Sequence, residues 1–179
     1  MTVIALRREL APDTIHLDAA TKDLLAWSLS QADDPTVHLG DRVGEIEPLL
    51  PVLIEQERGV LAPVGPAEVL KCLEAFAERR NLPMPENDFA LDLDIEIMGE
   101  WPRDLFRRAI RTAWTEWPYR RLPDANALKS YIREELEART AHLARLETLA
   151  RKLACRREME QRTQAMRAAS RRNHWPRIG

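Results

Sequence analysis

Arginine side chains are concentrated near the end of this chain, where few acidic residues accompany them. Residues 139–179 hold 11 Lys and Arg against 3 Glu, a balance of +8. Guanidinium groups bind phosphates and carboxylates through charge-assisted and often bidentate hydrogen bonds. The pattern therefore predicts contact with a negatively charged partner, either a nucleic acid or an acidic protein surface. The candidate binding residues are Arg156, Arg157, Arg162, Arg167, Arg171, Arg172 and Arg177.

A simpler interpretation accounts for part of this charge. Glu147 and Arg151 are four residues apart. Arg156 and Glu160 have the same spacing, and pairs at this spacing stabilise a solvated helix. From Arg162 to Arg177, however, the sequence contains no acidic residue. Partner contact therefore remains the preferred interpretation for that end of the chain.

The arginine-rich end belongs to a wider division of charge along the sequence. Residues 1–100 hold 8 Lys and Arg against 20 Asp and Glu, a balance of −12. Residues 101–179 hold 19 against 9, a balance of +10, and the net charge of −2 conceals the difference. Either the basic half has an acidic or polyanionic partner, or the two halves screen each other.

A second candidate surface combines aromatic and basic side chains between two predicted helices. Tyr119, Arg120 and Arg121 fall in a predicted turn, where they should be exposed. An aromatic ring beside arginines could stack on a nucleic-acid base. Trp114 and Trp117 lie on the same predicted helix face as apolar residues upstream, so we expect both in the hydrophobic core.

The other reactive residue types do not indicate an enzyme. No histidine stands at H-x-x-x-H spacing or beside a cysteine, so no zinc site is expected. No serine has a G-x-S-x-G setting, and the sequence lacks a glycine-rich phosphate loop. We therefore expect a protein that is not an enzyme and that uses neither a cofactor nor a metal.

Residues 88–98 alternate acidic and large aliphatic side chains, and two interpretations are open. Strict alternation predicts a half-buried strand. Phe89, Leu93 and Ile97 are also four residues apart, as on a helix, and no second strand of similar quality is present to pair with the first. We favour a helix, with pairing to Thr2–Leu6 as the alternative. The acidic residues are better explained as a solvated face that attracts the chain's own arginines than as a calcium-binding loop.

Capping residues, prolines and apolar spacing place the remaining elements. The predicted helices start at Asp18 or Thr21, near Glu47 or Pro48, at Pro66, at Trp101-Pro102 and at Pro123-Asp124. The signals that end the first four are Asp33, Gly59, Asn81 and Pro118. Leu153 is the last regularly spaced apolar residue. The tail beyond it cannot bury enough apolar area to offset its ordering entropy, so we expect fraying unless a partner orders it.

These elements predict an all-α fold. A compact bundle of four or five short helices is followed by a long C-terminal helix that ends in a basic, partly disordered tail. We divide the chain into an N-terminal helical region (1–58), a helical domain (59–140) and a basic extension (141–179). Leu136, Leu143 and Ala150 are seven residues apart, and Leu146 and Leu153 supply the alternate position of the seam. This gives the long helix about two heptads of coiled-coil character. This helix can pack on its own bundle or pair with a second copy.

The cysteines and the hydropathy indicate a compartment. Cys72 and Cys155 have no C-x-x-C partner, which favours a reducing cytoplasm. The first residues become charged too soon for a signal peptide, and no apolar run approaches the roughly 18 residues of a membrane span.

The order of signals between residues 60 and 140 is similar to that of a known domain. A proline-initiated amphipathic helix leads through Asn81-Leu-Pro to a second helix. Then follow Glu100-Trp-Pro-Arg-Asp-Leu105, an aromatic-rich turn, and Leu122-Pro123 before the last helix. This order resembles the small helical domain of phage replicative-helicase loader and inhibitor proteins, and of related prophage proteins in proteobacteria.

The resemblance implies a non-enzymatic adaptor in phage or prophage DNA replication that binds a hexameric replicative helicase. In that family a flexible part after the helical domain engages the helicase, and the matching segment here is Arg156–Gly179. The arginines also allow direct DNA contact. Two alternatives stay open, a direct DNA-binding protein of the small-terminase or regulator type and a structural coiled-coil oligomer.

Overall fold

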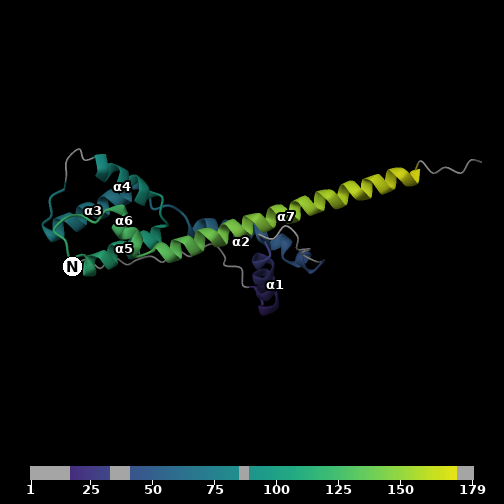
Figure 1. Ribbon diagram of the computed structural model, residues 1–179, viewed down its shortest axis with the longest axis horizontal. Coiled ribbons are helices and arrows are strands. Elements are labelled where there is room, and N and C mark those ends of the chain that lie inside the picture. Colours follow the sequence, from purple (N-terminus) through teal and green to yellow (C-terminus); the bar gives the residue numbers. More distant parts are fainter. Residues whose placement is uncertain (1–16, 33–40, 85–88, 173–179) are drawn as a thin grey trace, which may run out of the picture. The chain divides into compact units, whose positions relative to one another are not determined.

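The computed structural model describes residues 17–32, 41–84 and 89–172, and most of them are helical (Figure 1). Within these ranges there is no β-strand, only an isolated bridge between Pro63 and Pro102. The all-α prediction is therefore confirmed. The elements are α1 (Ala19–Ser30), the 3₁₀ helices η1 (Asp41–Glu45) and η2 (Glu47–Leu49), α2 (Leu50–Val60), α3 (Pro66–Arg80), α4 (Phe89–Gly99), α5 (Arg103–Glu116), α6 (Ala125–Ser130) and α7 (Arg133–Arg172).

The chain divides into two compact units. Unit 1 consists of Met1–Gln56 and Ala144–Gly179, and unit 2 of Glu57–Leu143. The helical domain expected at 59–140 lies within unit 2. The regions expected at 1–58 and 141–179 fall mainly together in unit 1. Helices α2 and α7 contribute residues to both units.

Several predicted helix ends are confirmed by their local geometry. The carboxylate of Asp18 accepts the Thr21 backbone N–H at 2.7 Å, caps α1, and has its pKa lowered by that bond. Pro66 is the first residue of α3, and Asn81 ends the helix in the left-handed conformation at φ 51°. The C-cap predicted at Gly59 is wrong, because α2 continues through it to Val60.

The ambiguous segment is helical, so the strand interpretation is wrong for residues 89–98. Helix α4 packs against α3 and α6, and it buries Ile95 and Met98 on one face. When every second residue of a helix is apolar, the apolar side chains do not share one face. Some of them point into the core and others point outward. The alternative partner Thr2–Leu6 lies outside the described residues.

The long helical run predicted from Pro123-Asp124 is interrupted. Asp124 accepts the Ala127 backbone N–H at 2.8 Å and caps the short α6, which ends at Ser130. Helix α7 then begins at Arg133 and continues to Arg172, well beyond Leu153. Its last turns are rich in Ala, Arg, Gln and Met, which favour helix without tertiary packing. The rest of the tail, residues 173–179, lies outside the described part of the chain.

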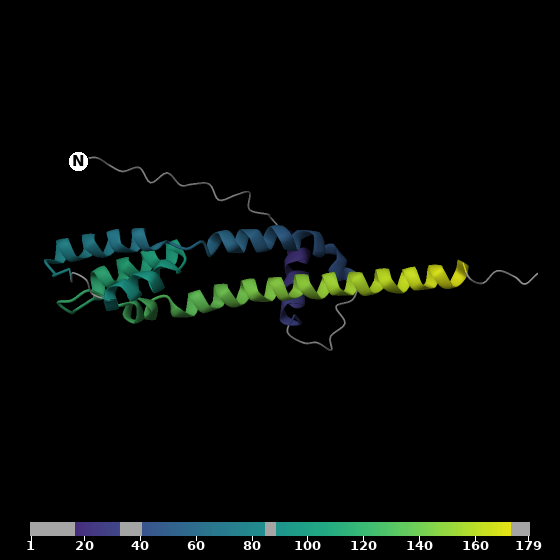
Figure 2. The same ribbon diagram turned by 90° about the horizontal axis from the view of Figure 1, so that it is seen from above.

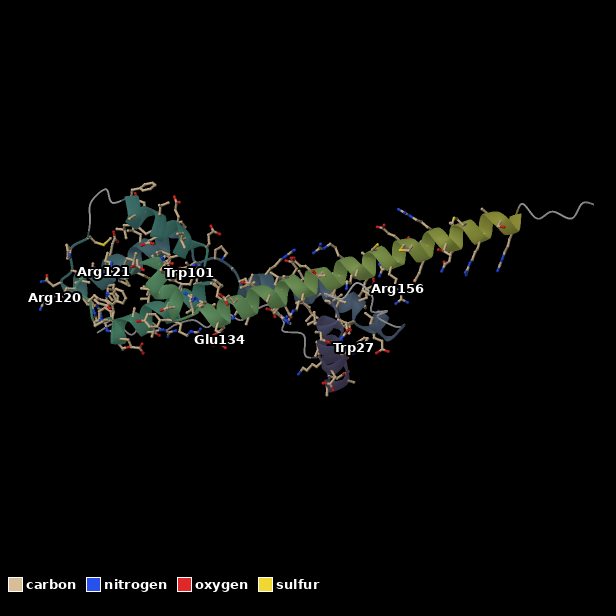
Figure 3. All side chains as sticks on the ribbon, in the orientation of Figure 1. Trp27, Trp101, Arg120, Arg121, Glu134 and Arg156 are labelled. Carbon is tan, nitrogen blue, oxygen red and sulfur yellow. The ribbon has the colours of Figure 1, made fainter. Side chains whose placement is uncertain are left out.

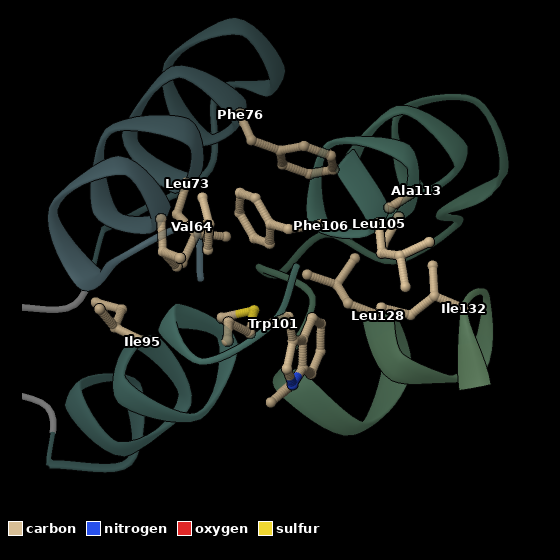
Figure 4. Packing of buried hydrophobic residues seen from close by; sticks show 14 of the residues in the cluster. Val64, Leu73, Phe76, Ile95, Trp101, Leu105, Phe106, Ala113, Leu128 and Ile132 are labelled. Carbon is tan, nitrogen blue, oxygen red and sulfur yellow. The ribbon is translucent and has the colours of Figure 1, made fainter. Parts of the chain in front are cut away.

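The hydrophobic core of unit 2 is built around two phenylalanines and two tryptophans (Figure 4). Phe76, Phe106 and Trp101 are buried together with Leu128 and Ile132, which come from α6 and its following turn. Figure 4 shows labelled side chains from α3, α4, α5 and α6 converging on one interior.

The two tryptophans at the C-terminal end of α5, Trp114 in the helix and Trp117 directly after it, differ in burial. The core prediction is confirmed for Trp117, whose indole Nε1 donates to the Arg121 carbonyl at 2.7 Å. It is wrong for Trp114, which is 38% exposed. Trp114 packs edge-on against Phe76 with ring centroids 5.4 Å apart, at the rim of the core.

A short extended segment before α3 forms backbone hydrogen bonds with the connection between α4 and α5. Val64 donates its backbone N–H to the Trp101 carbonyl, and Gly65 donates to the Gly99 carbonyl, both at 2.9 Å. A Cβ atom on Gly99 would lie 3.1 Å from the Pro66 ring, so glycine permits this close approach.

Unit 1 has a separate interior. On α7, Leu146, Leu149 and Leu153 are buried. Val43 of η1, Ile46 between η1 and η2, and Leu50 and Ile54 of α2 are buried as well. Figures 1 and 2 show α1 lying against α7 within this unit. These leucines include two predicted for a coiled-coil seam, so that part of the seam is used inside the chain. No helix among the described residues is both long enough and apolar enough to span a membrane.

Candidate interaction surfaces

The end of α7 presents an exposed basic surface. We call residues 159–171 the distal α7 segment, and every side chain in it is exposed. Figure 3 shows side chains projecting from opposite sides of this part of the helix. Arg162, Arg167 and Arg171 form no ion pair within the described residues, and beyond Glu160 the helix contains no acid.

The sequence explains why this segment is not packed. The buried stripe of α7 in unit 1 ends at Leu153. Steps of 7 and 11 residues along the same helix face reach Glu160 and Gln164. Steps of 14 and 18 residues reach Arg167 and Arg171. The face that would continue the stripe is therefore polar and cannot bury itself against the chain.

The arginines closer to Leu153 are engaged within unit 1. Arg157 forms an ion pair with Glu47 of η2 at 2.5 Å. Arg156 donates to Glu160 one turn along the helix at 2.7 Å, as the sequence predicted. Arg172 is the last residue of α7, and Arg177 lies outside the described residues. Of the predicted C-terminal arginines, Arg162, Arg167 and Arg171 remain as an unengaged set.

Two exposed methionines accompany these arginines. Met159 is 63% exposed and Met166 is 68% exposed. Their seven-residue spacing places them on one helix face, between Arg162 on one side and Arg167 on the other. Unbranched, polarizable methionine adapts to varied partners, and it is common at binding surfaces.

The aromatic turn at residues 117–121 belongs to unit 2 and is a separate surface. Tyr119 lies edge-on to Trp117 with ring centroids 4.9 Å apart. The Arg121 guanidinium lies 5.9 Å from both ring centroids and pairs with Asp124 at 3.6 Å. Arg120 is exposed at the tip of the turn (Figure 3). Tyr119 and Arg121 thus stabilise the turn, and Arg120 is the member most available to a partner.

The arginines of α5 are largely paired with acids of unit 2. The carboxylate of Glu68 in α3 forms ion pairs with Arg107 at 2.6 Å and with Arg103 at 3.2 Å. Glu135 of α7 accepts hydrogen bonds from Arg108 and from Arg139, and these bonds lower the pKa of its carboxyl. These contacts connect α5 to its neighbouring helices. Because the α5 arginines are occupied in this way, they are poor candidates for contacts to nucleic acid.

One structural arginine was not found from the sequence. Arg80, at the end of α3, donates to the carbonyl of Trp117 at 2.6 Å and to that of Trp114 at 2.8 Å. Its guanidinium also lies 5.2 Å from the Phe76 ring centroid and 5.8 Å from that of Trp114. It therefore caps the C-terminus of α5 from another helix. The 34 to 37 residues between the partners explain why no local pattern predicted it.

The described residues contain no group of three or more His, Cys, Asp and Glu side chains placed to hold a metal ion. In unit 2, His142 lies 3.8 Å from Glu57 beside a shallow hollow that Val60 and Arg139 also line. Burial raises the pKa of the Cys72 thiol, whereas Cys155 is exposed. None of these groups forms a recognisable catalytic arrangement.

No protein-family model, no curated protein and no solved structure matches this chain.

Proposed function

We propose that this protein is a non-enzymatic adaptor that binds a negatively charged partner through the distal α7 segment. One observation carries the proposal: Arg162, Arg167 and Arg171 stand on an ordered helix with no ion pair inside the described chain. The arginines of α5, in contrast, are largely occupied by the chain's own acids.

The physical chemistry of the segment favours an acidic protein surface. The segment is about 20 Å long at the helical rise of 1.5 Å per residue. A partner that covers it can bury Met159 and Met166 and supply carboxylates to the flanking guanidiniums. Long-range attraction would also raise the rate of encounter.

The resemblance of residues 60–140 to helicase loader and inhibitor proteins suggests which partner this is. We propose that the partner is the hexameric replicative helicase of the host, and that the protein is a phage or prophage replication accessory acting in the cytoplasm. The arrangement of the chain is compatible with this role, because unit 2 contains the resembling segment and α7 continues beyond it.

A capture experiment on the purified, immobilised helicase tests the proposal. The test variant replaces Arg162, Arg167 and Arg171 by alanine. The matched control removes the same charge from exposed sites in unit 2, namely Lys71, Arg79 and Arg133. Alanine favours helix, so both variants should fold.

We expect the test variant to bind the helicase at least about tenfold more weakly, a difference of about 1.4 kcal/mol, while the control binds like the wild type. Binding should withstand nuclease treatment. An equal loss of helicase affinity in both variants would show a general effect of charge and would contradict the proposal. Undiminished binding of the test variant would also contradict it.

Direct DNA binding is the second candidate function. It is favoured by the run of residues 161–171, which carries three arginines and no acid on an exposed helix. Titration of duplex DNA at several salt concentrations tests it. If the three arginines contact phosphates, the triple alanine variant should reduce the salt slope by up to about 0.9 per lost contact. A slope unchanged by the substitutions would rule these residues out as phosphate contacts.

A further inference from the structure

Helix α4 exposes a stripe of large apolar side chains. Phe89 is 75% exposed, Leu93 42% and Ile97 51%, while Ile95 and Met98 on the other face are buried. The three exposed residues are four apart, so they lie along one side of the helix over about 12 Å. Contiguous exposed apolar surface of this kind marks a site of interaction.

The stripe has an acidic border. Asp92 and Glu96 follow Phe89 and Leu93 by three residues, which places them beside the stripe on the helix surface, and both are exposed. Neither forms an ion pair within the described residues. A surface that is apolar in the middle and negative along one border calls for a partner that is apolar and positive.

The distal α7 segment has this composition. Met159 and Met166 are separated by about 10.5 Å along the helix axis, close to the length of the α4 stripe. Arg162 and Arg167 border them on either side and have no ion pair within the described residues. The two surfaces therefore match in length, in apolar content and in opposite charge.

We propose that the α4 stripe of one copy binds the distal α7 segment of a second copy. Two α4 stripes facing each other would bring like charges together, and so would two distal segments, whereas the mixed pairing neutralises both. The contact goes beyond the proposed function, because it forms without any partner. It would cover the basic segment until an acidic partner displaces the second copy.

This pairing is heterologous, since each copy offers one stripe and one segment. Such a contact continues from copy to copy unless the assembly closes into a ring. The mean mass of the pure protein should therefore increase with concentration, and added salt should reduce it because the contact is partly ionic.

Sedimentation velocity on the wild type, on two variants and on an equimolar mixture of the variants provides the test. The stripe variant is Phe89→Ser with Ile97→Ser, and the segment variant is Arg162→Glu with Arg167→Glu. All four side chains are exposed, so circular dichroism should match that of the wild type. We expect the wild type to self-associate and each variant alone to be monomeric. An equimolar mixture should form a dimer that does not grow, because one intact stripe then meets one intact segment.

Matched controls place comparable substitutions at other exposed sites, all in unit 2. Val60→Ser with Leu70→Ser changes two exposed apolar residues, and Arg79→Glu with Arg133→Glu reverses two exposed charges. Both should self-associate like the wild type.

Three results would overturn the pairing: a monomeric wild type, a stripe variant that still self-associates, or a segment variant that still self-associates. The helicase measurement is separate. If the wild type does not self-associate, the proposed function is unaffected. If the protein does not bind the helicase, the proposed contact between copies is unaffected.

Discussion

Replacing Arg80 by alanine should destabilise unit 2, although the side chain is only partly buried. The guanidinium donates two hydrogen bonds to carbonyls at the end of α5, where no intrahelical donor remains. The positive charge also lies at the negative end of the helix dipole. Removing the side chain would leave these carbonyls to water and would uncover the edges of Phe76 and Trp114.

The magnitude follows from these contacts. A hydrogen bond involving a charged group contributes about 1.5–3 kcal/mol, and a cation–π contact at an exposed site about 0.5–1 kcal/mol. Because one of the two hydrogen bonds is exposed to solvent, we expect a total loss of about 2–3 kcal/mol for Arg80→Ala. The neighbouring Arg79 is exposed and has no such contacts, so Arg79→Ala should stay within about 0.5 kcal/mol of the wild type.

Urea denaturation followed by tryptophan fluorescence measures both variants, since Trp114 and Trp117 lie beside the cap. Arg80→Lys provides a further comparison, because it keeps the charge but loses the planar fork that reaches two carbonyls, and it should fall between alanine and the wild type. Equal stability of the Arg80→Ala and Arg79→Ala variants would refute the account of the cap.

Three further predictions concern the core, the pH response and the thiols. Phe106→Ala should cost about 3–5 kcal/mol, and Trp114→Ala only about 1–2 kcal/mol because that ring is at the rim, as urea denaturation can show. Glu135 has a folded-state pKa below its unfolded value, so its stabilisation is present above the unfolded pKa of about 4.3 and is lost as the pH falls through the folded pKa. The melting-temperature difference between Glu135→Gln and the wild type should therefore be present at neutral pH and shrink as the pH is lowered below the unfolded pKa. A difference that does not shrink on acidification would contradict this role. Iodoacetamide should modify Cys155 at least about tenfold faster than Cys72, measured by mass spectrometry, and equal rates in the folded protein would contradict the described burial.

Local signals in the sequence were sufficient to place most helix ends. Asp18, Pro66 and Asn81 act within one turn of their own position, and each acts in the structure as predicted. The helical interpretation of residues 89–98 is also confirmed. It rested on the absence of a second strand with which a strand in this segment could pair. The break between α6 and α7 was not predicted, since both sides of Tyr131 keep a helical apolar spacing.

The features that sequence reasoning missed depend on contacts between distant residues. The cap provided by Arg80 and the pairing of Arg108 with Glu135 both connect different helices, over 27 to 37 residues. The exposed α4 stripe was missed for a related reason. An apolar residue at every second position does not tell which members face the core until the neighbours of the helix are known.

Hydrogen–deuterium exchange on the full chain, with and without the purified replicative helicase, tests the central claim most directly. The distal α7 segment has no tertiary packing among the described residues, so its amides should exchange quickly in dilute free protein. We predict that the helicase slows exchange across residues 159–171. A complex that protects only unit 2, or the absence of any complex, would contradict the claim that these free arginines are the binding surface.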